Sequence, residues 1–108
     1  MIPVEIVFRS HHTQVSDHMR RRAELAVEKV ARRLTRAVSA VVRFEADGRE
    51  RRVEIVLHAA HNQRLVANGT GRFFGTALAA AVARVEAQTN HAKRPAKERA
   101  RRAARGKA

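Results

Sequence analysis

Four segments of the chain alternate between apolar and polar residues, which is typical of β-strands with one buried face. The first covers residues 2–9, where every second residue is apolar: Ile2, Val4, Ile6 and Phe8. Residues 38–46 and 51–60 alternate in the same way, and after a turn at 61–63 a shorter strand is expected over residues 64–70. This alternation predicts a sheet with one apolar face and one polar face.

Two other segments repeat apolar residues at spacings of three and four, which indicates amphipathic helices. The first opens at Ser16, a good N-cap, and Asp17 follows at the positive end of the helix dipole. It is expected to run for about twenty residues. Its predicted apolar stripe comprises Met19, Ala23, Ala26, Val27, Val30 and Leu34. The second helix begins at Phe74, and its stripe comprises Phe74, Ala77, Leu78, Ala81, Val82 and Val85.

The strands at 38–46 and 51–60 are joined by a short loop, and charge decides between two registers. A two-residue loop at 47–48 is the usual short hairpin signal, but it sets like charges opposite one another. Opposite-charge pairs across strands are favoured by about 0.2–1 kcal/mol each, so we predict a four-residue loop at 47–50. The pairs expected from that loop are Arg43–Glu54, Glu45–Arg52, Phe44–Val53 and Val42–Ile55.

The order of these elements predicts an α+β fold: two-layer β-α-β-β-β-α, a four-stranded mixed sheet with two helices on one face. The first helix is a crossover, so the first two strands should be parallel neighbours, and the last three strands an antiparallel meander. The domain is expected to span residues 1–94. Residues 95–108, which begin with Pro95, have no apolar stripe and are expected to form a basic disordered tail. The glycines at 69, 71 and 75 follow no phosphate-loop spacing and are expected to let the last strand turn into the helix.

Charge narrows the class of partner. The chain has 23 basic and 10 acidic residues, a net charge of +13, and residues 1–90 alone carry +6. Arg22, Lys29, Arg33 and Arg36 form a basic row beside the stripe of the first helix, and Arg84, Gln88 and His91 occupy the equivalent flank of the second. Glu24 and Glu28 fall on the far side, where Glu28 is expected to pair with Arg32. We therefore predict one continuous basic surface that binds a polyanion. The alternative is that the many arginines reflect only a biased composition and a solvated surface.

Other kinds of chemistry find little support in the sequence. The chain has no cysteine, and its histidines at 11, 12, 18, 58, 61 and 91 show no metal-ligand spacing. No nucleophile–base pair stands out, so we predict a protein that is not an enzyme and uses no cofactor. No apolar run is long enough to span a membrane and the first residues lack a signal-peptide pattern, so a cytoplasmic location is expected. With four Phe and no Trp or Tyr, structured RNA is favoured over single strands and over DNA.

Several short motifs, taken in order, resemble one family. They are V-S-D-x-M at residues 15–19, Lys29-Val30, the strand at 65–71, Ala77-Leu78 and residues 84–88. Their spacing over residues 2–94 is similar to that of the short ribosome hibernation promoting factors and ribosome-associated inhibitor A. The resemblance implies a fold like a double-stranded-RNA-binding domain. It also implies binding to rRNA in the small-subunit cleft that holds mRNA and the A- and P-site tRNAs, which blocks translation under stress or in stationary phase.

The resemblance places the rRNA contacts at Lys29, Arg84, His91 and Lys93, and the basic surface adds to them. The whole predicted rRNA-binding set is Arg22, Lys29, Arg33, Arg36, Arg84, Gln88, His91, Lys93 and Arg94. The predicted phosphate contacts of the tail are Lys97, Arg99, Arg101 and Arg102. The chain departs from the family at Ala26, at Ala87 and at residues 73–75.

The expected partner is thus the small ribosomal subunit, with no membrane and no small-molecule substrate, and the protein is expected to be monomeric off the ribosome. A general double-stranded-RNA or nucleoid-binding protein is the alternative of the same class. A small His-dependent hydrolase is the alternative of a different class.

Overall fold

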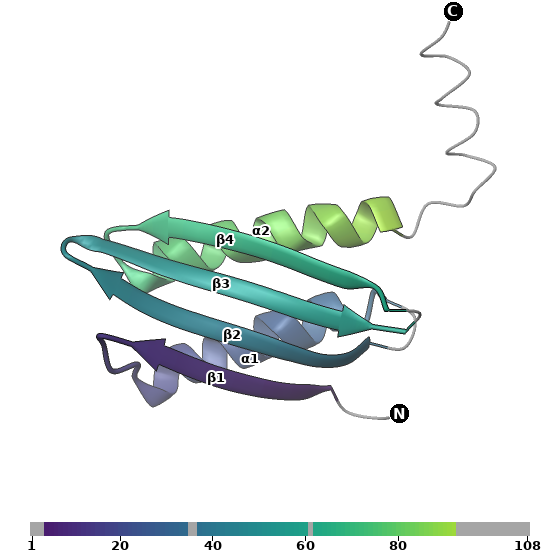
Figure 1. The fold of residues 1–108 in the computed structure, drawn as a ribbon, viewed down its shortest axis with the longest axis horizontal. Helices are drawn as coiled ribbons and strands as arrows, with labels where there is room; N and C mark the ends of the chain where they lie inside the picture. The colour runs from purple at the N-terminus through teal and green to yellow at the C-terminus, as the bar shows by residue number, and fades with distance from the viewer. Residues whose placement is uncertain (1–3, 35–36, 61, 93–108) are drawn as a thin grey trace, which may run out of the picture.

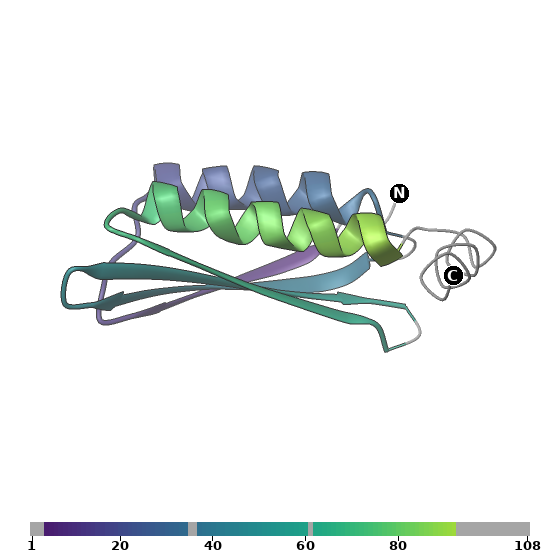
Figure 2. The same ribbon diagram turned by 90° about the horizontal axis from the view of Figure 1, so that it is seen from above.

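The computed structural model describes residues 4–34, 37–60 and 62–92. Its elements are β1 (Glu5–His11), α1 (Asp17–Ala31), β2 (Ala37–Asp47), β3 (Glu50–Ala59), β4 (Arg64–Gly71) and α2 (Phe74–Ala92). The strands form one sheet in the order β1-β2-β3-β4, and both helices lie side by side on the same face of it (Figures 1 and 2). β1 pairs with β2 in parallel, and the other neighbours are antiparallel. The predicted two-layer fold is confirmed.

The β2–β3 hairpin has the register that the charges predicted. Arg43 lies opposite Glu54 and Glu45 opposite Arg52, and the two predicted apolar pairs are also present. The ladder extends to the Asp47–Glu50 pair, one pair further than expected. The loop therefore has two residues, Gly48 and Arg49, instead of the predicted four. Gly48 has φ +59°, a left-handed conformation that glycine adopts without steric penalty. A Cβ at this position would meet nothing within 4 Å, so the requirement for glycine here is conformational.

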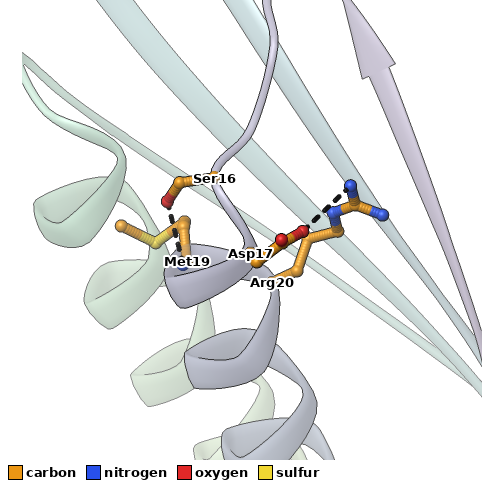
Figure 3. A network of polar contacts seen from close by, with 4 residues as sticks. All are labelled: Ser16, Asp17, Met19 and Arg20. Carbon is orange, nitrogen blue, oxygen red and sulfur yellow. Dashed lines mark hydrogen bonds and ion pairs between the residues drawn. The ribbon is translucent and has the colours of Figure 1, made fainter.

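Helix α1 begins as predicted and ends earlier. The Ser16 hydroxyl accepts a hydrogen bond from the backbone N–H of Met19 at 3.1 Å, and Asp17 pairs with Arg20 at 3.5 Å (Figure 3). The helix ends at Ala31, after 15 residues. The N–H groups of Arg33 and Leu34 bond to carbonyls three residues back, so the chain leaves the helix through a tighter turn that still buries Leu34.

The hydrophobic core lies between the helices and the sheet. Phe44 is fully buried at its centre, with Phe8 stacked at 6.5 Å and Phe74 in edge-to-face contact at 5.5 Å between ring centroids. Both predicted stripes contribute, with two differences: Ala31 is buried, whereas Ala26 is only half-buried. The core cluster comprises Ala23, Val27, Val30, Ala31, Leu34, Ala40, Val42, Phe44, Val53, Ile55, Leu57, Ala59, Leu65, Ala67, Ala77, Leu78, Ala81 and Val85.

Gly69 serves a different purpose from the one predicted. It lies inside β4 rather than in the turn that follows, and it is buried beneath α2. A Cβ at Gly69 would lie 2.0 Å from the carbonyl oxygen of Ala77 and 2.6 Å from the backbone nitrogen of Ala81. Glycine is therefore needed because the α2 backbone rests directly on the β4 backbone.

Candidate nucleic-acid interface

Arg22 of α1 lies on the flank of the helix that faces α2. Both helices run in the same direction, because α1 crosses between parallel strands and α2 follows a strand antiparallel to β3 (Figure 2). The guanidinium Nη1 of Arg22 reaches the first turn of α2, where it lies 3.2 Å from the position that a Cβ would take at Gly75. Lys29 follows Arg22 by two helical turns, so it lies on the same flank, and it is exposed. Arg33 is half-buried in the turn just after the helix. We call Arg22, Lys29 and Arg33 the α1 basic row.

The corresponding flank of α2 faces the open edge of the sheet. Arg84 donates a hydrogen bond to the backbone carbonyl of Asn68, and the Gln88 amide donates to the carbonyl of Val66 at 2.8 Å. Both carbonyls belong to β4, which is the edge strand of the sheet among the described residues, so no neighbouring strand there donates to them. The two side chains thus satisfy part of an unpaired sheet edge, the kind of edge that otherwise invites pairing with another chain.

The prediction of one continuous basic surface was therefore wrong in its geometry. In parallel helices, equivalent flanks point the same way, so the α1 basic row faces α2 while Arg84 and Gln88 face away from α1. The body of α2 stands between them, and its outward residues there are alanines such as Ala79 and Ala83, both exposed. The Arg84 guanidinium remains exposed, but one of its donors is already engaged with the sheet.

The α1 basic row carries charge that nearby carboxylates do not neutralise. Within residues 4–34, 37–60 and 62–92, the ion pairs are Arg20–Asp17 at 3.5 Å, Arg21–Glu24 at 2.9 Å and Arg52–Glu50 at 3.7 Å. No member of the row takes part in them. The expected Glu28–Arg32 ion pair is not formed, because Arg32 lies just beyond the last helical residue and meets Glu28 through its backbone N–H.

Some predicted site residues cannot be placed. Arg36, Lys93, Arg94 and the four tail positions lie outside the described residues, as does the proposed tail itself. His91 belongs to the last turn of α2. Among the residues that the structure describes, no three His, Asp or Glu side chains gather as metal ligands, and no helix is long and apolar enough to cross a membrane.

One exposed aromatic residue was missed as a candidate contact. Phe73 is 72% exposed immediately before α2, and its neighbour Arg72 is exposed as well. Phe74 occupies the stripe position and enters the core, so the ring of Phe73 is left outside. Two adjacent phenylalanines at the start of a helix could therefore have indicated one exposed ring from the sequence. An exposed ring beside a guanidinium can stack on a nucleobase.

Comparisons with known proteins identify a matching family and similar structures. The sequence model described as "Sigma 54 modulation protein / S30EA ribosomal protein" matches residues 6–97. The structure is similar to the Protein Y N-terminal domain of Thermus thermophilus, with TM-score 0.73 and 17% identity, covering 85% of this chain and 100% of that one. It is also similar to a ribosomal subunit interface protein from Coxiella burnetii, with TM-score 0.69 and 13% identity, covering 83% of this chain and 98% of that one. No curated protein sequence matches the chain significantly. At such identities the structural likeness concerns the fold.

Proposed function

This chain belongs to the sigma 54 modulation protein / S30EA ribosomal protein family, and from that premise we propose that it binds the small ribosomal subunit and blocks translation. The binding site is rRNA in the cleft that holds mRNA and the A- and P-site tRNAs. The protein acts in the cytoplasm under stress or in stationary phase, as a binding protein and not as an enzyme. The similar structure from Coxiella burnetii is that of a ribosomal subunit interface protein, which supports the same partner.

The observation that carries the proposal is the unneutralised α1 basic row. Arg22 and Lys29 are exposed and lie two helical turns apart, about 10 Å along the axis, so each can meet a separate phosphate. A guanidinium can hold a phosphate through two parallel hydrogen bonds, whereas an ammonium acts as a point charge. The row is fixed on a helix whose other side is in the core, which gives the contacts a defined geometry.

The proposed mechanism is steric occlusion strengthened by phosphate neutralisation. A folded domain held in the cleft excludes mRNA and tRNA by its volume alone, so no chemical step is required. Each neutralised phosphate contributes about −0.9 on a B-form duplex, or about −0.7 on single strands, to the slope of log affinity against log salt. With roughly six to eight contacts, binding should fall by orders of magnitude between low and moderate salt.

The test is co-sedimentation with ribosomes from growing and starved cells over a salt series, together with a translation assay. The variant Arg22→Glu/Lys29→Glu should lose ribosome binding at physiological salt and lose inhibition. The matched control is Arg9→Glu/Arg49→Glu, which makes the same change in net charge at exposed positions on β1 and in the β2–β3 turn. Arg84 is avoided because its reversal would also remove its bond to Asn68.

Two results would contradict the proposal. If the α1 double variant still sediments with ribosomes as the control does, the row is not the interface. If gel shifts show that naked RNA or DNA duplexes bind the protein as tightly as ribosomes do, the protein is a general duplex or nucleoid binder. The ribosome is then not its specific target.

A further inference from the structure

The face of the sheet that points away from the helices carries an unexpected apolar row. Val7, Val41, Val56 and Val66 lie side by side, one from each strand, because each is the register partner of the next. Val7 is 39% and Val66 37% exposed, and Val56 is buried yet lies outside the core cluster. The solvent face of such a sheet is normally polar, so four adjacent valines there need an explanation.

Charged residues flank the valine row in a regular pattern. Arg43 on β2 lies opposite Glu54 on β3, and one step further along Glu45 lies opposite Arg52. On the other side of the row, the outer strands carry Glu5 on β1 and Arg64 on β4. Across the midline of the sheet, therefore, each acidic position of these pairs has a basic counterpart. Among the described residues Arg43, Glu45 and Glu54 make no ion pair, so their charges are available to a partner.

We propose that this open face binds the same face of a second copy of the chain, about a two-fold axis that runs parallel to the strands between β2 and β3. Such an axis places β2 of one copy on β3 of the other, and β1 on β4. Each contact then occurs twice, as in any two-fold interface. The contacts it creates are Arg43 with Glu54, Glu45 with Arg52, Glu5 with Arg64, Val41 with Val56 and Val7 with Val66.

Charge complementarity selects this occupant over others. The face carries carboxylates among its guanidinium groups, which disfavours a phosphate backbone as partner. The proposed axis sets opposite charges against each other at three facing pairs and like charges at one, Asp47 and Glu50 at the hairpin end, where Glu50 already pairs with Arg52 at 3.7 Å. Complementary charges fix the register of an interface more than its strength. A two-fold axis along the valine row would instead set Arg43 against Ser39 and Glu54 against His58. That arrangement matches Arg9 with Glu5 but leaves Arg43 and Glu54 without an opposite charge. The proposed axis matches both Arg43 and Glu54, so it is preferred.

The geometry is compatible with known sheet packing, and the interface is small. Two sheets that pack face to face keep their strands within about 30° and lie about 10 Å apart, which valine side chains can fill. Four strands spaced about 4.8 Å apart give a face only about 15–20 Å wide, at the lower end of specific interfaces. We therefore expect a concentration-dependent dimer, in place of the monomer predicted from the sequence. Both helix layers stay on the outside (Figure 2), so two α1 basic rows remain accessible.

The decisive experiment mixes two variants, Arg43→Glu and Glu54→Arg. Alone, each variant sets like charges against each other at both Arg43–Glu54 contacts of a dimer, so each should sediment as a monomer where the wild type associates. Mixed, the two restore opposite charges at both contacts, and a mixed dimer should form. Within one copy both variants place like charges side by side, so an intramolecular effect alone cannot be rescued by mixing. Sedimentation velocity with one variant fluorescently labelled gives the readout, and Arg49→Glu in the turn is the charge-matched control.

A second measurement keeps the test valid if a reversal unfolds the chain. The chain contains no cysteine, so Val41→Cys and Val56→Cys can each be made alone. Under mild oxidation their mixture should form crosslinked dimers several-fold faster than either variant by itself, because Val41 faces Val56 across the axis. Three results would each overturn the proposal. The wild type could stay monomeric at the highest concentration measured, or the mixed charge variants could fail to associate. The two cysteine variants and their mixture could also crosslink at equal rates. Ribosome binding by the α1 basic row does not enter either readout.

Discussion

The two helices lie side by side on one sheet and run in the same direction, yet they contact that sheet differently. Helix α1 packs against the sheet with bulkier side chains of its own, including Val27 and Val30. The side chains of its basic row make no hydrogen bond or ion pair among the described residues. Helix α2 presents Ala77 and Ala81 to the sheet and lies directly on Gly69. Its polar flank then bonds to the carbonyls of β4.

Equal spacing of polar residues on two helices therefore does not give those residues equal roles. A flank that overlooks the neighbouring helix leaves its cations free for an external anion. The same flank, when it overlooks an unpaired strand, meets carbonyl groups that accept its hydrogen bonds. Substitutions on the two helices can test this contrast between α1, whose cations are exposed, and α2, whose side chains bond to the sheet edge.

The largest effect is expected for Gly69→Ala. The new methyl group would fall within the α2 backbone, so the helix must shift from the sheet, and we expect a loss of about 3 kcal/mol or more in the free energy of unfolding. Gly48→Ala is the matched control: it meets no atom and only strains a positive φ, which costs about 1 kcal/mol. Urea denaturation of both variants measures the difference. Equal losses would show that α2 does not rest on β4 this closely.

The next effect concerns ribosome binding. Arg22→Gln/Lys29→Gln removes two proposed phosphate contacts and should lower the log-log salt slope by about 1.4–1.8, with about tenfold or more weaker binding at physiological salt. Because these side chains hold no structural bond, the urea midpoint should not change. A double variant that binds normally, or one that binds weakly because it is less stable, would contradict the role given to α1.

The helix starts differ as well. Ser16→Ala removes the hydroxyl that accepts from the Met19 N–H and should reduce stability by about 1 kcal/mol. The corresponding residue before α2 is Phe73, whose exposed ring offers no acceptor, so Phe73→Ala should stay within about 0.5 kcal/mol. Thermal unfolding followed by circular dichroism distinguishes the two. A larger loss at Phe73 would mean that its ring contributes to stability.

The smallest effect is expected for the edge contact. Arg84→Met loses one exposed hydrogen bond to the Asn68 carbonyl, which should reduce stability by about 0.5–1 kcal/mol. Lys29→Met on α1 makes a comparable change to an exposed basic side chain without such a bond, and should be near neutral. Parallel urea titrations give the comparison; a neutral Arg84→Met would mean that the contact does not stabilise the fold.

The elements, their order and the register of the β2–β3 hairpin could be predicted from sequence patterns alone. Alternation and helical spacing identify which side chains are apolar, and those patterns are local. The Arg43–Glu54 and Glu45–Arg52 pairs selected the hairpin register because strand neighbours close in sequence meet in only a few possible ways. The cap at Ser16 is equally local.

Which surfaces the polar residues face became clear from the three-dimensional arrangement of the elements. The roles of Arg84 and Gln88 depend on which strand lies at the sheet edge, and the need for glycine at position 69 depends on the distance between helix and sheet. The valine row exists only once four strands from distant parts of the chain are in register. These features involve residues far apart in sequence, and periodicity along a single element carries no information about its neighbours in space.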